Sequence, residues 1–172
     1  MVNFRTFELF LGAWSLINNT RTENGVEIYD TTYGDNPAGT IMYTSSGFMS
    51  AVLTATNATL RPQDLTLPAQ DNQTDAEWAT VGRHTLAYSG PFYFNQTIKH
   101  NETNGQVVHG PLISSTLPSF VGSLQHRTFS FHDDYQTLEL IGDLGNGVVD
   151  TLYWAKINRD FLLSDIGHLY SA

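Results

Sequence analysis

The sequence predicts an all-β protein: a closed, eight-stranded, up-and-down barrel with one inserted helix and a short C-terminal helix. Runs of alternating apolar and polar residues are separated by turn residues, as at Asn24-Gly25, Asn104-Gly105 and Gly145-Asn146-Gly147. An open sheet of this size would expose two unpaired edges, and closure into a barrel removes them. A barrel of eight strands has an interior wide enough for one small ligand.

The predicted strands follow one another with mostly short connections. They comprise residues 12–23, 38–44, 48–56, 92–97, 106–116, 124–132, 137–142 and 148–158. Residues 57–73 are polar and contain prolines, which indicates a loop, and residues 117–122 are expected to form a turn with an apolar tip. No repeat or linker interrupts the pattern, so residues 1–172 are expected to form a single domain.

Residues 74–89 differ from the rest, because their apolar side chains recur at helical spacing. Thr74 can cap a helix, Glu77 lies three residues later, and Gly90-Pro91 is expected to end the helix. The residues that show the helical spacing are Trp78, Val81, Thr85 and Tyr88. The short C-terminal helix is predicted at residues 161–170.

Composition excludes several classes of function. The chain has 172 residues and a formal net charge of −9, which argues against a nucleic-acid phosphate backbone or an anionic lipid surface as partner. It has no cysteine, so disulfides, thiolate metal sites and cysteine nucleophiles are excluded. No apolar run approaches the roughly 20 residues of a membrane span. Neither a Gly-x-Ser-x-Gly motif nor a glycine-rich phosphate loop is present.

Two features bear on where the protein works. The apolar residues 7–17 resemble a signal peptide only weakly, because Glu8 interrupts them and no cleavage site follows, so they are expected to belong to the fold. Five Asn-x-Thr sequons begin at Asn18, Asn57, Asn72, Asn95 and Asn101. The sequons indicate either a glycoprotein or a β protein rich in Thr and Asn. The expected location is the secretory pathway or the cell exterior if an upstream signal was removed, and otherwise the cytoplasm.

Short motifs spread over residues 9–158 resemble the lipocalin-like domain family of bacteria and fungi, which has calycin-type barrels. The motifs occupy residues 11–16 (LGAWSL), 33–39 (YGDNPAG), 41–44 (IMYT), 47–51 (GFMSA), 87–90 (AYSG), 118–122 (PSFVG) and 152–157 (LYWAKI). Phe120 stands where the family pattern has Trp, and Lys156 stands where it has Arg. The resemblance implies that Lys156 packs over the Trp14 indole and closes the base of the barrel.

Fungal relatives occur among natural-product pathway proteins, and some lipocalin-like barrels there are cyclases. The resemblance therefore implies a cofactor-independent cyclase or isomerase, including a pericyclase such as a Diels–Alder or hetero-Diels–Alder catalyst, acting on a hydrophobic natural-product intermediate. The alternative is a non-catalytic carrier or sensor of a small hydrophobic ligand. No cofactor and no nucleic-acid partner are expected, and a homodimer is left open.

Arg127 is the first candidate for contact with a substrate. In residues 124–132, Phe129 and Phe131 share a face with Arg127, and this aromatic face is expected to point into the barrel. A buried guanidinium needs an anion or a ligand, because burying it alone is costly. Two interpretations stay open, an ion pair with Glu139 on the next strand and a hydrogen bond to a substrate oxygen.

His109 and Tyr43 join Arg127 as the predicted catalytic donors. The expected substrate-binding residues are Met49, Tyr88, Tyr93, Phe120, Phe129 and Tyr153. Core packing is the alternative for each tyrosine. None of the six histidines forms an i,i+4 pair, so no metal site is expected. A purely aromatic interior would indicate a carrier, whereas two or more polar side chains on one inner wall would indicate an enzyme.

Overall fold

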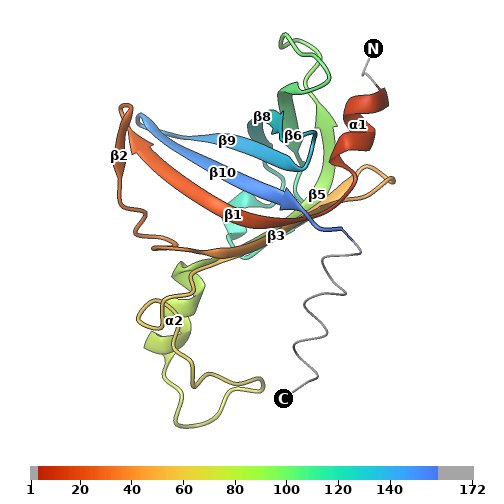
Figure 1. Cartoon of the computed structure of the whole chain (residues 1–172). Helices are drawn as coiled ribbons and strands as arrows, with labels where there is room; N and C mark the ends of the chain where they lie inside the picture. The colour runs from red at the N-terminus through yellow and green to blue at the C-terminus, as the bar shows by residue number, and fades with distance from the viewer. Residues whose placement is uncertain (1–3, 159–172) are drawn as a thin grey trace.

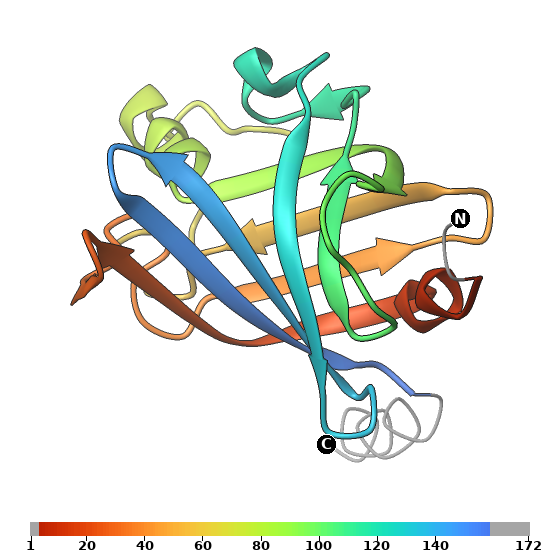
Figure 2. The same cartoon turned by 90° about the horizontal axis from the view of Figure 1, so that it is seen from above.

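The protein folds as a closed antiparallel β-barrel, as predicted, in a computed structural model that describes residues 4–158 (Figure 1). The barrel strands are β1 (Gly12–Glu23), β3 (Ala38–Tyr43), β4 (Phe48–Thr54), β5 (Thr85–Phe94), β6 (Asn104–His109), β8 (Gln125–His132), β9 (Thr137–Gly145) and β10 (Val148–Lys156). Each pairs with the next along the chain, and β10 pairs with β1 to close the ring. In Figure 2, β3, β4 and β5 cross behind β8, β9 and β10.

Two short strands lie outside the ring. Strand β2 (Val26–Ile28) pairs with the end of β1, and β7 (Ser114–Ser115) pairs with β5. Between β7 and β8, a 3-10 turn, η1 (Pro118–Phe120), occupies the predicted apolar turn. The strand predicted over residues 106–116 was too long, because β6 ends at His109, where Gly110 takes a φ of +122° that other residues avoid.

The inserted helix is confirmed but is shorter than predicted. Helix α2 (Asp75–Arg83) has Thr74 as its N-cap, and Thr74 forms the expected capping box with Glu77. It ends six residues before the predicted boundary, because residues 85–94 form one continuous strand that pairs with β4. The hydrogen bonds between β5 and β4 therefore outweighed the helical preference that the apolar spacing indicated. The predicted helix at residues 161–170 lies outside the described residues.

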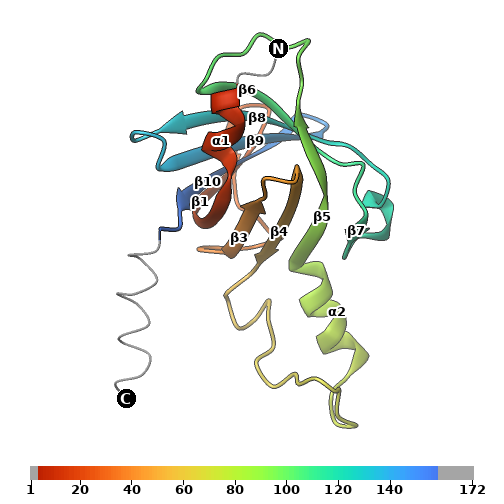
Figure 3. The same ribbon diagram turned by 90° about the vertical axis from the view of Figure 1, so that its right-hand side faces the viewer.

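Residues 7–17 belong to the fold, as expected, because they lie in helix α1 (Phe4–Phe10) and the start of β1. Helices α1 and α2 lie at opposite ends of the barrel (Figure 3). The ring of Phe10 is fully buried and packs edge-on against Tyr43, Phe94, Phe129 and Phe131 at centroid distances of 4.9–5.2 Å. Helix α1 therefore closes the base of the barrel with an aromatic core. Neither helix within residues 4–158 has the length and apolarity that a membrane crossing requires.

Trp14 and Lys156 close the base as predicted. Trp14 is fully buried, and its Nε1–H donates to the Phe10 carbonyl at 2.9 Å. The Nζ of Lys156 lies 4.8 Å from the centre of the indole and donates to the Leu9 carbonyl at 3.0 Å. The charge is thus held against an aromatic face and a helix C-terminus, both of which favour a cation.

Three of the five sequons share one local structure. The side-chain oxygens of Asn57, Asn95 and Asn101 each accept hydrogen bonds from the backbone N–H and hydroxyl of the threonine two residues later. Such turns favour Asn and Thr at this spacing for conformational reasons alone. Local turn chemistry therefore accounts for part of the sequon excess.

Candidate functional site

The aromatic core fills the base half of the barrel and leaves a cavity in the other half. The cavity has a volume of about 210 Å³. Its apolar lining comes from six strands or turns and comprises Ile41, Leu53, Leu86, Phe120, Leu140, Leu144, Leu152 and Trp154, with Tyr33 and Tyr88 at its polar margins. This is below the 300–1,000 Å³ of pockets for drug-sized ligands, so the cavity suits a small molecule. Helix α2 contributes no residue to the lining.

A chain of buried polar groups runs from the aromatic core to this cavity. His109 on β6 accepts or donates a hydrogen bond at each ring nitrogen. The Tyr43 hydroxyl lies 2.9 Å from Nε2 and the Tyr88 hydroxyl lies 3.4 Å from Nδ1. All three side chains are buried, and only Tyr88 lines the cavity. The structure therefore brings two predicted donors, Tyr43 and His109, together beneath a predicted binding residue, Tyr88.

The chain of Tyr43, His109 and Tyr88 is uncharged at neutral pH. Burial and, to a smaller extent, the nearby Arg127 charge together lower the pKa of His109 to about 3. Burial also raises the pKa values of both tyrosines, although Arg127 opposes the rise. A neutral imidazole has one N–H and one lone pair. One tyrosine must therefore donate to His109 while the other accepts from it, which orders the hydroxyl of Tyr88 at the cavity wall.

Arg127 lines the same cavity from β8, which confirms that it faces inward. Its Nη1 donates to the carbonyl of His126 at 2.7 Å, and its Nη2 lies 3.5 Å from Oε1 of Gln125. A β-carbon on Gly142 of β9 would lie 3.1 Å from the Cζ and Nε of Arg127, so Gly142 leaves the space that the guanidinium occupies. Within residues 4–158, Arg127 has no carboxylate partner.

Of the two interpretations left open for Arg127, the ion pair with Glu139 is therefore wrong. Glu139 lies between two inward-facing leucines of β9 and points outward, since side chains alternate along a strand. There it accepts hydrogen bonds from the Tyr153 hydroxyl at 3.0 Å and from Nε2 of His132 at 3.0 Å.

Of the six predicted binding residues, the structure places Tyr88 and Phe120 at the cavity. Met49 and Phe129 are buried in the core and do not line it. Tyr93 and Tyr153 do not face the interior either, because each alternates with inward neighbours on its strand; Tyr93 is 46% exposed. The sequence could have predicted this for Tyr93, because it lies between Phe92 and Phe94 and alternate side chains of a strand point to opposite faces.

A second polar cluster at the margin of the cavity was not predicted from the sequence. Arg21 of β1 forms two hydrogen bonds with the Asp150 carboxylate, at 2.6 and 2.7 Å, and an ion pair with Asp30 at 2.7 Å. Asp30 also accepts the backbone N–H of Thr32 at 2.8 Å. These contacts tie residues 29–37 to β1 and β10, so they position Thr32 and Tyr33 at the cavity.

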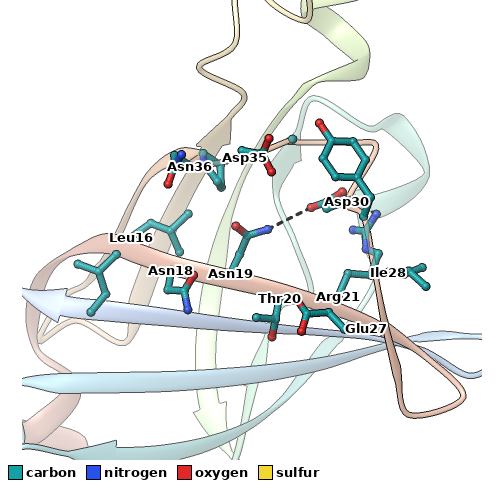
Figure 4. Close-up of a pocket in the computed structure, with 14 residues that line it drawn as sticks. Leu16, Asn18, Asn19, Thr20, Arg21, Glu27, Ile28, Asp30, Asp35 and Asn36 are labelled. Atoms are coloured by element: carbon teal, nitrogen blue, oxygen red, sulfur yellow. Dashed lines mark hydrogen bonds and ion pairs between the residues drawn. The ribbon is translucent and has the colours of Figure 1, made fainter.

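Arg21 also borders an open groove on the outside of the barrel, between β1 and residues 27–37 (Figure 4). The groove encloses about 840 Å³ and is lined mainly by polar side chains, among which Asn19 donates to Asp30 at 3.3 Å. Within residues 4–158, no three His, Asp or Glu side chains are grouped so that they could hold a metal ion. The cavity inside the barrel, rather than this outer groove, combines apolar walls with oriented donors.

A family model described as a lipocalin-like domain matches residues 11–157. No curated protein matches the chain. A solved structure of a redesigned β-barrel is similar at 11% identity and a TM-score of 0.42, over 90% of this chain and 96% of that one. The match to the family model spans every barrel strand, the Trp14–Lys156 base and the residues that line the cavity. The chain belongs to the lipocalin-like domain family.

Proposed function

We propose that the protein is a cofactor-independent isomerase or cyclase that acts on a small, largely apolar, unsaturated molecule bound in the barrel cavity. The observation that carries the proposal is the clustering of polar side chains on one inner wall. Tyr88 and Arg127 line the cavity from β5 and β8, and His109 lies on β6 between them. A carrier of apolar molecules needs no such ordered donors.

The chemistry follows from the donors and the enclosing walls. In an isomerisation or cyclisation, π electrons of the substrate move to form new bonds, and no atom is gained or lost. Negative charge grows on a conjugated carbonyl oxygen as the electrons move. The guanidinium of Arg127 and the hydroxyl of Tyr88 are oriented to stabilise that charge, and the apolar walls hold the substrate in a reactive conformation.

The test uses a panel of small linear polyene ketones and polyenoic acids, each incubated with the protein and separated by liquid chromatography with mass detection. A converted substrate gives a product of the same mass at a new retention time. Arg127→Met is expected to slow single-turnover conversion about 10²–10³-fold. Because Arg127 forms no ion pair with a carboxylate among residues 4–158, the melting temperature of the variant protein should change little.

Arg83→Met is the matched control, because Arg83 lies exposed at the end of α2 and its loss removes the same charge away from the cavity. An Arg127→Met protein that converts substrates as fast as the unmodified protein would exclude a catalytic role for Arg127.

A carrier is the second candidate, favoured by the eight apolar side chains of the lining. Recovery of bound panel compounds with unchanged retention times from the unmodified protein would support the carrier and contradict the enzyme.

A further inference from the structure

The cavity wall contains a buried donor that the proposed reaction does not use. Trp154 of β10 lines the cavity and is 2% exposed, and its Nε1–H has no hydrogen-bond partner among residues 4–158. The other two indoles differ, since Trp14 donates to the Phe10 carbonyl and Trp78 is 37% exposed. A buried N–H without an acceptor costs free energy, which an oxygen atom of a bound molecule would recover.

The charges around the cavity are also unequal. At its margin, Arg21 is shared by Asp30 and Asp150, so that cluster carries more negative than positive charge. Arg127 lies over Gly142, the residue of β9 that pairs with Asp150 of β10. Its hydrogen-bond partners among residues 4–158 are neutral, and so are its neighbours Tyr43, Tyr88 and His109. Among the described residues, Arg127 is therefore a half-buried cation at the cavity wall that forms no ion pair with a carboxylate.

We propose that the cavity selects an apolar carboxylic acid in its ionised form, with Arg127 as counter-ion and the Trp154 indole as a second hydrogen-bond donor. The inference rests on the proposed function in placing the substrate in this cavity, and it adds the chemical class of that substrate. A guanidinium offers several N–H groups in one plane and binds a carboxylate through two of them. The alkyl or alkenyl part of the acid would contact the leucine side chains of the lining.

The binding test compares acids with amides of the same shape. Octanoate with octanamide, and trans-cinnamate with trans-cinnamamide, are titrated calorimetrically into the full chain at 0.15 M ionic strength, where a Debye length of about 8 Å screens the overall charge. Each acid is expected to bind about 10- to 100-fold more tightly than its amide, as charge-assisted hydrogen bonds do. Arg127→Met should abolish the preference, whereas Arg127→Lys should retain part of it and Arg83→Met all of it.

The indole signals provide an independent readout of the second donor. In ¹H–¹⁵N spectra, titration with octanoate should shift the Trp154 indole resonance, which is identified by its loss in Trp154→Phe. The Trp14 indole resonance should stay in place, because its hydrogen bond to Phe10 is internal. Trp154→Phe should weaken octanoate binding about 2- to 10-fold, the typical effect of one hydrogen bond.

Equal affinities for acid and amide, an unchanged preference in Arg127→Met, or binding of neither pair would overturn the proposal. An unmoved Trp154 resonance at saturating octanoate would remove Trp154 from it. The outcomes also separate this inference from the proposed function. Acid selectivity without any conversion of the polyene panel contradicts only the enzyme, and conversion of neutral ketones without acid selectivity contradicts only this inference.

Discussion

The guanidinium of Arg127 packs over the backbone of Gly142 on the neighbouring strand, where a β-carbon would lie 3.1 Å from its Cζ and Nε. The backbone of Gly142 is not in the left-handed region, so a larger residue meets only the side chain of Arg127. Strand β9 therefore accommodates Arg127 by omitting a side chain opposite it.

Gly142→Ala is expected to displace the guanidinium of Arg127 while leaving its charge in the cavity. Octanoate binding should weaken about 2- to 10-fold, a loss comparable to one misaligned hydrogen bond. Gly82→Ala is the control, since nothing lies within 4 Å of a β-carbon there. Unchanged octanoate affinity in Gly142→Ala would mean that the present position of the guanidinium does not matter for binding.

Trp14→Ala is expected to lower the free energy of unfolding by about 3–5 kcal/mol, because it empties the core at the base of the barrel. Lys156→Met keeps the apolar stem and removes the cation over the indole, so it should cost about 0.5–2 kcal/mol. Urea unfolding of the two variants measures both effects. A Trp14→Ala protein as stable as the unmodified one would contradict the structural role of the base.

His109 should make the protein less stable in acid. Its pKa in the folded protein is about 3, below the ordinary value of about 6.5 that applies when it is unfolded. Between these values the unfolded chain binds more protons at this residue, so stability falls as pH falls, by up to about 1.4 kcal/mol per pH unit.

The contribution of His109 is isolated by comparison with His109→Gln, which retains a polar side chain and does not titrate. Urea unfolding between pH 6 and 4 should show a steeper loss of stability in the unmodified protein than in the variant. Parallel curves would show that His109 does not change its protonation on unfolding.

Arg21→Met is expected to destabilise the protein by about 3–5 kcal/mol, because it leaves Asp30 and Asp150 facing each other without a cation. The double variant Arg21→Met/Asp150→Asn should recover part of this loss. Urea unfolding of the single and double variants gives the coupling energy between the two positions. Strictly additive effects would contradict a functional ion pair at the cavity margin.

Glycosylation is expected at one or more of the five sequons if the protein passes through a secretory pathway. Asn18, Asn57, Asn72 and Asn101 are exposed, whereas Asn95 is half-buried. Treatment of natively produced protein with an amide-cleaving glycosidase should then reduce its mass. An unchanged mass would leave turn formation as the reason for the Asn-x-Thr pattern.

The sequence by itself determined the closed barrel, the extent of β1 and the inward direction of Arg127, and its resemblance to the lipocalin-like family implied the contact of Lys156 with Trp14. These depend on local alternation, turn residues and short motifs, which the chain carries within a few residues of each position. Tertiary pairing decided the rest. The spacing of Tyr88 fits a helix, but in the structure Tyr88 lies on a strand that pairs with β4. No sequence pattern indicated that Arg21 contacts Asp150, which is 129 residues away. The chain from Tyr43 through His109 to Tyr88, and the unpartnered indole of Trp154, depend on which side chains meet across the barrel. Contacts between residues so far apart produce no periodic pattern in the sequence, because the two partners become neighbours only when the barrel closes.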